Sequence, residues 1–96
     1  MKFPDSMIYR LHAIRRMFER DITEEAIKAI LQGGLVIQEY IDDKPYPSYL
    51  VAGEHEKRPL HIVVSVNNDD QTTIVITAYV PDLDEWEPGY MARRKK

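Results

Sequence analysis

The sequence predicts an α+β fold in which two N-terminal helices pack on one face of a four-stranded antiparallel sheet, in the order ααββββ. Up to Gly33, apolar side chains recur at helical spacing. After Gly33-Gly34, β-branched and aromatic residues form short runs between turn-forming residues, which is typical of strands. A chain of 96 residues suits one domain over residues 1–96, with a core over 6–87 and a basic tail over 91–96.

The first helix is predicted over about residues 7–19. Met7, Leu11, Ile14 and Phe18 follow one another at spacings of four, three and four, so they share one face of a helix. Ser6 stands where an N-cap belongs. We expect the apolar face of this helix to lie in the core.

The second helix is predicted to begin after Thr23. Two glutamates follow Thr23, and acidic side chains suit the positive end of a helix. Gly33-Gly34 ends the pattern. The apolar stripe between these limits consists of Ala26, Ile27, Ile30 and Leu31.

The remaining chain predicts four strands, and the last two form a hairpin. The strands cover residues 35–41, 48–53, 59–66 and 72–80. The hairpin turn is Asn67–Gln71, because its residues tolerate turn geometry. If Val66 opposes Thr72, then His61 opposes Thr77.

Strand alternation then gives this hairpin two different faces. The apolar face, expected to receive the helices, consists of Leu60, Ile62, Val64, Ile74, Ile76 and Ala78. The other face gathers His61, Ser65, Thr73, Thr77 and Tyr79, together with Val63 and Val75.

Composition limits the class of protein. Thirteen basic and sixteen acidic residues give a net charge of −3, so any nucleic-acid site must be local. Residues 10–20 carry four arginines against one glutamate, the N-terminal concentration of positive charge. The absence of cysteine excludes disulfides and thiolate metal sites. Because no apolar run approaches the ~20 residues that span a bilayer, we expect a cytoplasmic protein without a membrane segment.

Three runs of sequence carry a family resemblance. These are residues 11–25 (LHAIRRMFERDITEE), 58–64 (RPLHIVV) and 76–81 (ITAYVP), with Trp86 beyond them. Over about residues 6–87 the chain resembles the bacterial domain of unknown function family 4258. This resemblance implies a RelE-like fold, a toxin-type ribonuclease activity and a small zinc-finger antitoxin as partner. Carried over by motif position, the polar signature of the family falls on His12, Arg20, Arg58, His61, Thr77 and Tyr79.

These residue types suit metal-independent cleavage of RNA. Attack by the 2′-hydroxyl of RNA needs a base, an acid for the leaving oxygen and a cation over the phosphate. Histidine titrates near neutrality, and arginine holds two phosphate oxygens at once. We expect catalytic roles for His12, His61, Arg58, Thr77 and Tyr79, phosphate contacts from Arg16, Arg20 and Arg58, and no metal or other cofactor.

Each of these residues also has a structural interpretation. His12 lies at the boundary between core and solvent, where it would bond a carbonyl, and His61 would form an ordinary cross-strand pair. Arg20 would complement the dipole at a helix C-terminus, and Arg58 would pair with an acid of the preceding turn. Tyr79 and Trp86 would serve in packing.

Three functions therefore remain open. The first is an endoribonuclease toxin, and the second is an inactive toxin-fold module that binds a protein partner or RNA. The third is an interaction module whose sheet edge, Leu35 to Ile41, pairs with another chain, including a second copy. An active site requires His12, Arg58, His61, Thr77 and Tyr79 to converge in one cleft that reaches solvent, and their dispersal favours a scaffold. We expect the acidic segment near Trp86 to shield such a site.

Overall fold

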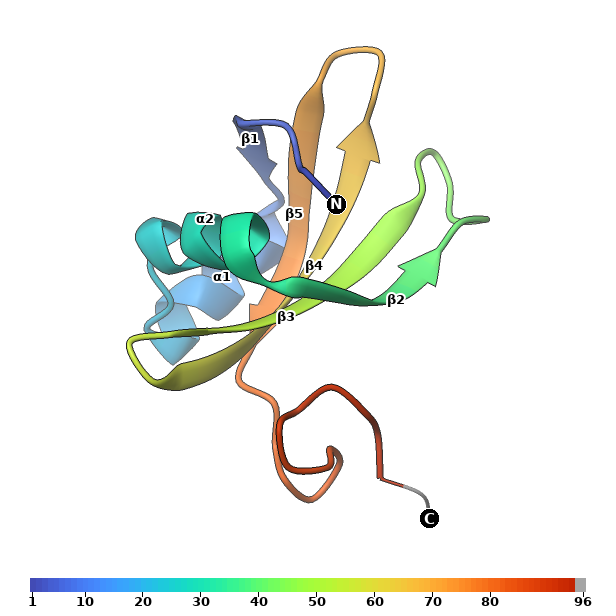
Figure 1. Ribbon diagram of the computed structural model, residues 1–96. Coiled ribbons are helices and arrows are strands. Elements are labelled where there is room, and N and C mark those ends of the chain that lie inside the picture. The colour runs from blue at the N-terminus through green and yellow to red at the C-terminus, as the bar shows by residue number, and fades with distance from the viewer. Residues whose placement is uncertain (95–96) are drawn as a thin grey trace.

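The chain folds into two helices and a five-stranded mixed sheet, in the order βααββββ (Figure 1). The computed structural model describes residues 1–94. The elements are β1 (Ser6–Tyr9), α1 (Leu11–Arg20), α2 (Glu24–Gly33), β2 (Leu35–Tyr40), β3 (Ser48–His55), β4 (Arg58–Asn67) and β5 (Thr72–Tyr79). The strand order is β1-β5-β4-β3-β2, in which β1 and β5 are parallel and the other neighbours are antiparallel. The α+β class, both helices and four antiparallel strands are as expected, and the fifth strand is new.

The first element corrects the prediction that residues 7–19 are one helix with Ser6 as N-cap. Ser6–Tyr9 is a strand, and α1 begins only at Leu11. Met7 therefore belongs to β1, where it pairs with Thr73 of β5. Without β1, the outer edge of β5 would leave backbone groups unpaired. The pairing of β1 with β5 therefore decides the conformation of Ser6–Tyr9, although the apolar spacing of these residues also suits a helix.

The apolar face of α1 points to solvent, which corrects the expectation that it lies in the core. Ala13 is the fully buried residue of this helix, and Met17 packs partly against the core. Leu11, Ile14 and Phe18 are exposed. Because α1 lies against β5, the small Ala13 side chain permits close approach on one side while the larger apolar residues face away.

The second helix follows its prediction. The Thr23 hydroxyl accepts a hydrogen bond from the backbone N–H of Ala26, as expected of an N-cap. Ala26, Ile27, Ile30 and Leu31 are all buried. α2 packs on β3 and β4, so the core lies between this helix and the sheet.

The hairpin of β4 and β5 has a different register from the predicted one. Thr72 pairs with Asn67 rather than Val66. Asn67 extends the strand because its side-chain oxygen accepts hydrogen bonds from the backbone N–H groups of Asp69 and Asp70, which holds the turn. A register shift farther along sets His61 opposite Tyr79 and Thr77 opposite Val63, so the predicted His61–Thr77 pair is wrong.

This shift is a β-bulge at Ile76, and it changes which side chains of β5 meet the helices. Val75 belongs to the core cluster together with Val64, which corrects its expected place on the polar face. Ala78 joins the core beyond the bulge, as predicted. Thr73 is fully buried, and its hydroxyl donates to the carbonyl of Pro4. His61 and Tyr79 lie on the sheet face opposite the helices, which we call the far face.

Within residues 1–94, no helix has the length and apolar character needed to cross a membrane.

Candidate functional sites: a buried histidine cluster and an exposed helix face

His61 is the centre of a closed cluster on the far face. Its side chain is fully buried. Nε2 lies 2.6 Å from the carbonyl oxygen of Tyr90, and Nδ1 lies 3.1 Å from the hydroxyl of Tyr79. A carbonyl can only accept, so Nε2 carries a hydrogen, and Nδ1 of the neutral ring accepts the hydrogen of the Tyr79 hydroxyl. Both ring nitrogens are therefore occupied.

The surroundings of His61 favour its neutral form. Burial lowers its pKa below the ordinary value, because a charged ring loses its hydration. The hydrogen bond to Tyr90 acts in the opposite direction, and the positive charge of Arg93 lowers the pKa further. Burial also raises the pKa of Tyr79, so its phenol keeps its proton at neutral pH.

Residues 81–94, which we call the C-terminal segment, close this cluster. Trp86 is buried, and its ring meets that of His61 edge to face with centroids 4.4 Å apart. Arg93 lies over the Trp86 ring, 4.8 Å from its centroid. The segment curls back on itself beyond the end of β5, where Trp86 and Arg93 form an isolated bridge (Figure 1). The segment near Trp86 thus covers His61, as expected of a shield.

The expected basic tail is part of this segment rather than a separate extension. The Arg94 guanidinium donates to the carbonyl of Leu83 and lies 3.8 Å from the Glu87 carboxylate. Residues 95–96 of the tail lie outside the described residues.

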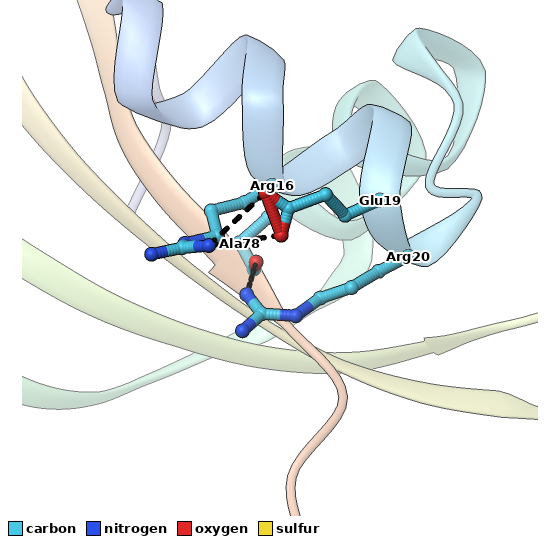
Figure 2. Close-up of polar contacts among 4 residues, drawn as sticks. All are labelled: Arg16, Glu19, Arg20 and Ala78. Atoms are coloured by element: carbon cyan, nitrogen blue, oxygen red, sulfur yellow. Dashed lines mark hydrogen bonds and ion pairs between the residues drawn. The ribbon is translucent and has the colours of Figure 1, made fainter.

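Arg20 and Arg58 join α1 to the sheet on the side of the helices. Arg20 donates to the carbonyl of Ala78 at 3.0 Å. Figure 2 draws this contact from α1 to the sheet. Arg58 donates to the carbonyls of Arg20 and of Asp21, the latter at 2.7 Å. These carbonyls stand at the end of α1, where helix carbonyls lack partners within the helix. Two of the three predicted phosphate ligands, Arg20 and Arg58, therefore serve as structural links.

The other predicted residues of α1 lie apart from His61. Arg16 forms an ion pair with Glu19 at 2.9 Å (Figure 2). His12 is exposed on α1. Thr77 is half-buried and shares the far face with Tyr79. The structure thus brings His61, Thr77 and Tyr79 to one face, leaves His12 and Arg58 on the side of the helices, and forms no single cleft from all five.

The exposed face of α1 is the second candidate site. It consists of Leu11, Ile14 and Phe18, which are 65%, 50% and 88% exposed, and we call it the α1 face. Three large apolar side chains at helical spacing form a contiguous patch, and patches of this kind mark interaction surfaces. A groove of about 470 Å³ lies beside it, lined by Tyr9, Ile14, Met17, Phe18, Asp21, Ile22 and Glu24.

Tyr9 is the polar group of this groove whose hydrogen bonding is incomplete. Its hydroxyl is buried and has no hydrogen-bond partner among residues 1–94. Burial raises the pKa of Tyr9, and the Glu24 carboxylate raises it further as the neighbouring acceptor toward which the hydroxyl is directed, although the two groups do not reach hydrogen-bond geometry.

Sequence reasoning names His61 and Tyr79 but not the contacts that close the cluster, and it places the apolar side of α1 in the core. Arg93 is expected in a basic tail, and nothing in the sequence marks the carbonyl of Tyr90 as the partner of His61. For the α1 face a signal exists, since Ala13 lies on the opposite side of the helix from Leu11 and Phe18. A small residue at that place permits the close helix–sheet contact that turns the larger side chains outward.

No group of His, Asp or Glu side chains within residues 1–94 is arranged to hold a metal ion.

Together the fold and the two sites define a small α+β protein with a closed histidine cluster and an open apolar helix face. The chain belongs to the family described as domain of unknown function (DUF4258), whose model matches residues 9–80. The comparisons with curated proteins and with solved structures gave no match. The family expected from the three sequence runs is therefore confirmed, and the likeness to RelE-type toxins is not.

Proposed function

We propose that this chain is a catalytically inactive module of the RelE-like toxin type that binds a protein partner through the α1 face. The observation that carries the proposal is the exposure of Leu11, Ile14 and Phe18 on one side of α1. Burying such side chains against a partner stabilises a complex by roughly 25 cal/mol per Å² of apolar surface.

The state of the predicted catalytic residues supports binding over cleavage. A general base must come within hydrogen-bond reach of the proton it removes, and the buried His61 already uses both nitrogens. The guanidinium groups of Arg20 and Arg58 are bonded to backbone carbonyls, and His12 lies away from the far face. The dispersal of these groups is the outcome that favours a scaffold.

Charge supports a protein partner over RNA. The chain carries a net charge of −3, and the C-terminal segment places four acidic residues between 82 and 87 beside the far face. RNA binding depends on cations that neutralise phosphates, and the acids would oppose it. The α1 face presents apolar side chains, which suit a protein surface.

An endoribonuclease is the second candidate function, and one observation favours it. His61, Thr77 and Tyr79 share the far face, and Arg93 lies beside them as a cation. In this alternative the C-terminal segment must move away before RNA reaches Tyr79. The hydroxyl of Tyr79 would then take the proton of the attacking 2′-hydroxyl while its own proton passes to Nδ1 of His61.

Photo-crosslinking in a bacterial host tests the proposed binding face. In the test variant, a benzophenone amino acid replaces Arg15, which is exposed beside the α1 face. In the matched control, it replaces Asp69 in the exposed β4–β5 turn. We expect a covalent adduct with a protein from position 15 and none from position 69. The Phe18→Asp substitution should remove the adduct, because a buried carboxylate without a partner opposes association.

Equal adducts from both positions, or an adduct that survives Phe18→Asp, would contradict the proposal. Because Phe18 is 88% exposed, its replacement should leave the fold intact, and circular dichroism of the purified variant verifies this.

A further inference from the structure

We infer that the C-terminal segment opens away from the far face as one unit, and that its contact with the neutral ring of His61 holds it closed. This conformational device lies apart from the α1 face, so it goes beyond the proposed function and does not depend on it. It is carried by the way in which the hydrogen bonds of the segment are distributed.

The C-terminal segment is bonded mainly to itself. Its ends meet in the bridge of Trp86 and Arg93 and in the ion pair of Arg94 with Glu87. Backbone N–H groups inside the segment donate to backbone carbonyls inside it, in donor-to-acceptor order Trp86 to Asp82, Glu87 to Ala92, Tyr90 to Glu87 and Arg94 to Glu85. The segment therefore has bonds that keep its shape without help from the sheet.

The attachment of the segment to the sheet is concentrated at His61. Among residues 1–94, the hydrogen bond from Nε2 of His61 to the carbonyl of Tyr90 is the one that joins the segment to the rest of the chain. The ring of Trp86, which is 3% exposed, adds its contact with the His61 ring. The link to the sheet is the exposed Val80, just beyond Tyr79, the last paired residue of β5. Movement at this link breaks the contacts with His61 and leaves the pairing of β4 with β5 intact.

The closed arrangement fits the neutral ring of His61. Nδ1 accepts the hydrogen of the Tyr79 hydroxyl, so a proton added at Nδ1 displaces that hydrogen. Burial opposes the charge of a protonated ring and lowers the pKa of His61. The bond to Tyr90 favours the charged ring, but it is the smaller effect, and the positive charge of Arg93 opposes it. Protonation therefore favours the open segment, in which the ring reaches water.

The other groups around the ring do not offset this preference. β3 sets the uncharged Ala52 opposite His61. Burial raises the pKa of Tyr79, and Arg93 acts in the opposite direction. Tyr40 of β2 and Glu85 of the segment raise it further, so Tyr79 stays neutral. Among residues 1–94, no carboxylate forms an ion pair or a hydrogen bond with the His61 ring.

Acrylamide quenching of the single tryptophan, Trp86, tests the attachment at about pH 7.5, where His61 is neutral. We expect weak quenching in the wild type and severalfold stronger quenching in His61→Ala, which lacks both the N–H donor and the ring. Val63→Ala is the matched control, because Val63 is half-buried on the same face of β4, and it should behave like the wild type. Circular dichroism should stay native in all three. A shielded Trp86 in His61→Ala, or unfolding of the sheet together with the segment, would overturn the inference.

A pH series on the wild type tests the role of the neutral ring without any substitution. In the open segment His61 titrates near its ordinary value of about 6.5, so below that pH the ratio of open to closed chains should rise by up to about tenfold per pH unit. Quenching of Trp86 should therefore increase while circular dichroism is still native. His61→Gln, whose amide N–H replaces that of Nε2 but does not titrate, should stay shielded, and His12→Gln, at an exposed site, should respond like the wild type. No increase in the wild type, or an equal increase in His61→Gln, would overturn the inference.

Backbone ¹⁵N relaxation of His61→Ala tests whether the segment moves as one unit. The N–H groups of Glu87 and Arg94 should keep the order of folded backbone, because their hydrogen bonds lie inside the segment. Order should fall at Val80, where the segment joins β5. Loss of order throughout residues 81–94 would show that the segment unfolds instead of opening, and would overturn the inference.

Discussion

At the scale of the residue, His61 shows how far the sequence alone could lead. Strand alternation correctly separates His61 from Leu60 and Ile62, because alternation is a local property of the backbone. The predicted partner Thr77 is wrong, because the register depends on how Asn67 holds the turn and on the bulge at Ile76. The contact with Trp86 joins segments far apart in the chain, so no local pattern around His61 predicts it.

His61 also gives the fold a defined pH dependence. Burial lowers its pKa in the folded chain, whereas the unfolded chain titrates near the ordinary value of about 6.5. Above that pH both states are neutral, and the full stability is present. As the pH falls below it, the unfolded chain binds a proton that the folded chain does not, so the free energy of unfolding decreases until the folded pKa is reached.

Urea unfolding at about pH 7.5 and about pH 5.5, followed by the fluorescence of the single tryptophan Trp86, measures this effect. We expect the wild type to lose stability at up to about 1.4 kcal/mol per pH unit through this group. His61→Gln should lose less over the same interval, and His12→Gln, at an exposed site, should behave like the wild type. Identical losses in His61→Gln and wild type would contradict the assignment.

At the scale of the element, α1 and α2 differ in how well local patterns predict them. The stripe, N-cap and end of α2 follow from the sequence because its apolar face meets the sheet directly. The periodicity of α1 correctly shows a helix, but it cannot tell whether the apolar side faces the core or a partner. β1 was missed because its four residues continue the helical spacing of α1, and only the edge of β5 selects the strand.

The junction between α2 and β2 depends on the close approach of Gly34 to the sheet. A Cβ atom there would lie 2.6 Å from the carbonyl oxygens of Ala52 and Ile30, both of which are backbone atoms. Gly34→Ala should therefore lower the free energy of unfolding by about 1–3 kcal/mol, as overpacking does. Gly33→Ala is the matched control, because a Cβ at Gly33 meets no atom within 4 Å.

Equilibrium urea unfolding of the two variants measures the difference. Gly33→Ala should be neutral or slightly stabilising, since alanine favours the helix more than glycine does. Equal effects of the two substitutions would show that the contact at Gly34 is not tight.

At the scale of the whole molecule, the functional residues separate into two regions with different roles. The far face is closed by the C-terminal segment around His61, and the helix side is linked by Arg20 and Arg58. Among residues 1–94, the predicted catalytic residues of these two regions do not meet in one cleft: His61 and Tyr79 lie on the far face, and Arg58 lies on the side of the helices. What remains open is the α1 face, and it lies on the helix where the sequence showed its N-terminal positive charge. The sheet edge expected to bind another chain is also present, since β2 ends the strand order.

RNA profiling after regulated expression in a bacterial host tests most directly whether this chain leaves RNA uncleaved, as an inactive module does. The set contains the wild type, His61→Ala, and Trp86→Ala, which removes the ring that covers His61. Our account predicts intact cellular RNA and the same fragment pattern in all three, because the buried His61 has both ring nitrogens engaged and the exposed His12 lies away from it. RNA fragments produced by the wild type or by Trp86→Ala, and lost with His61→Ala, would contradict it and establish the endoribonuclease.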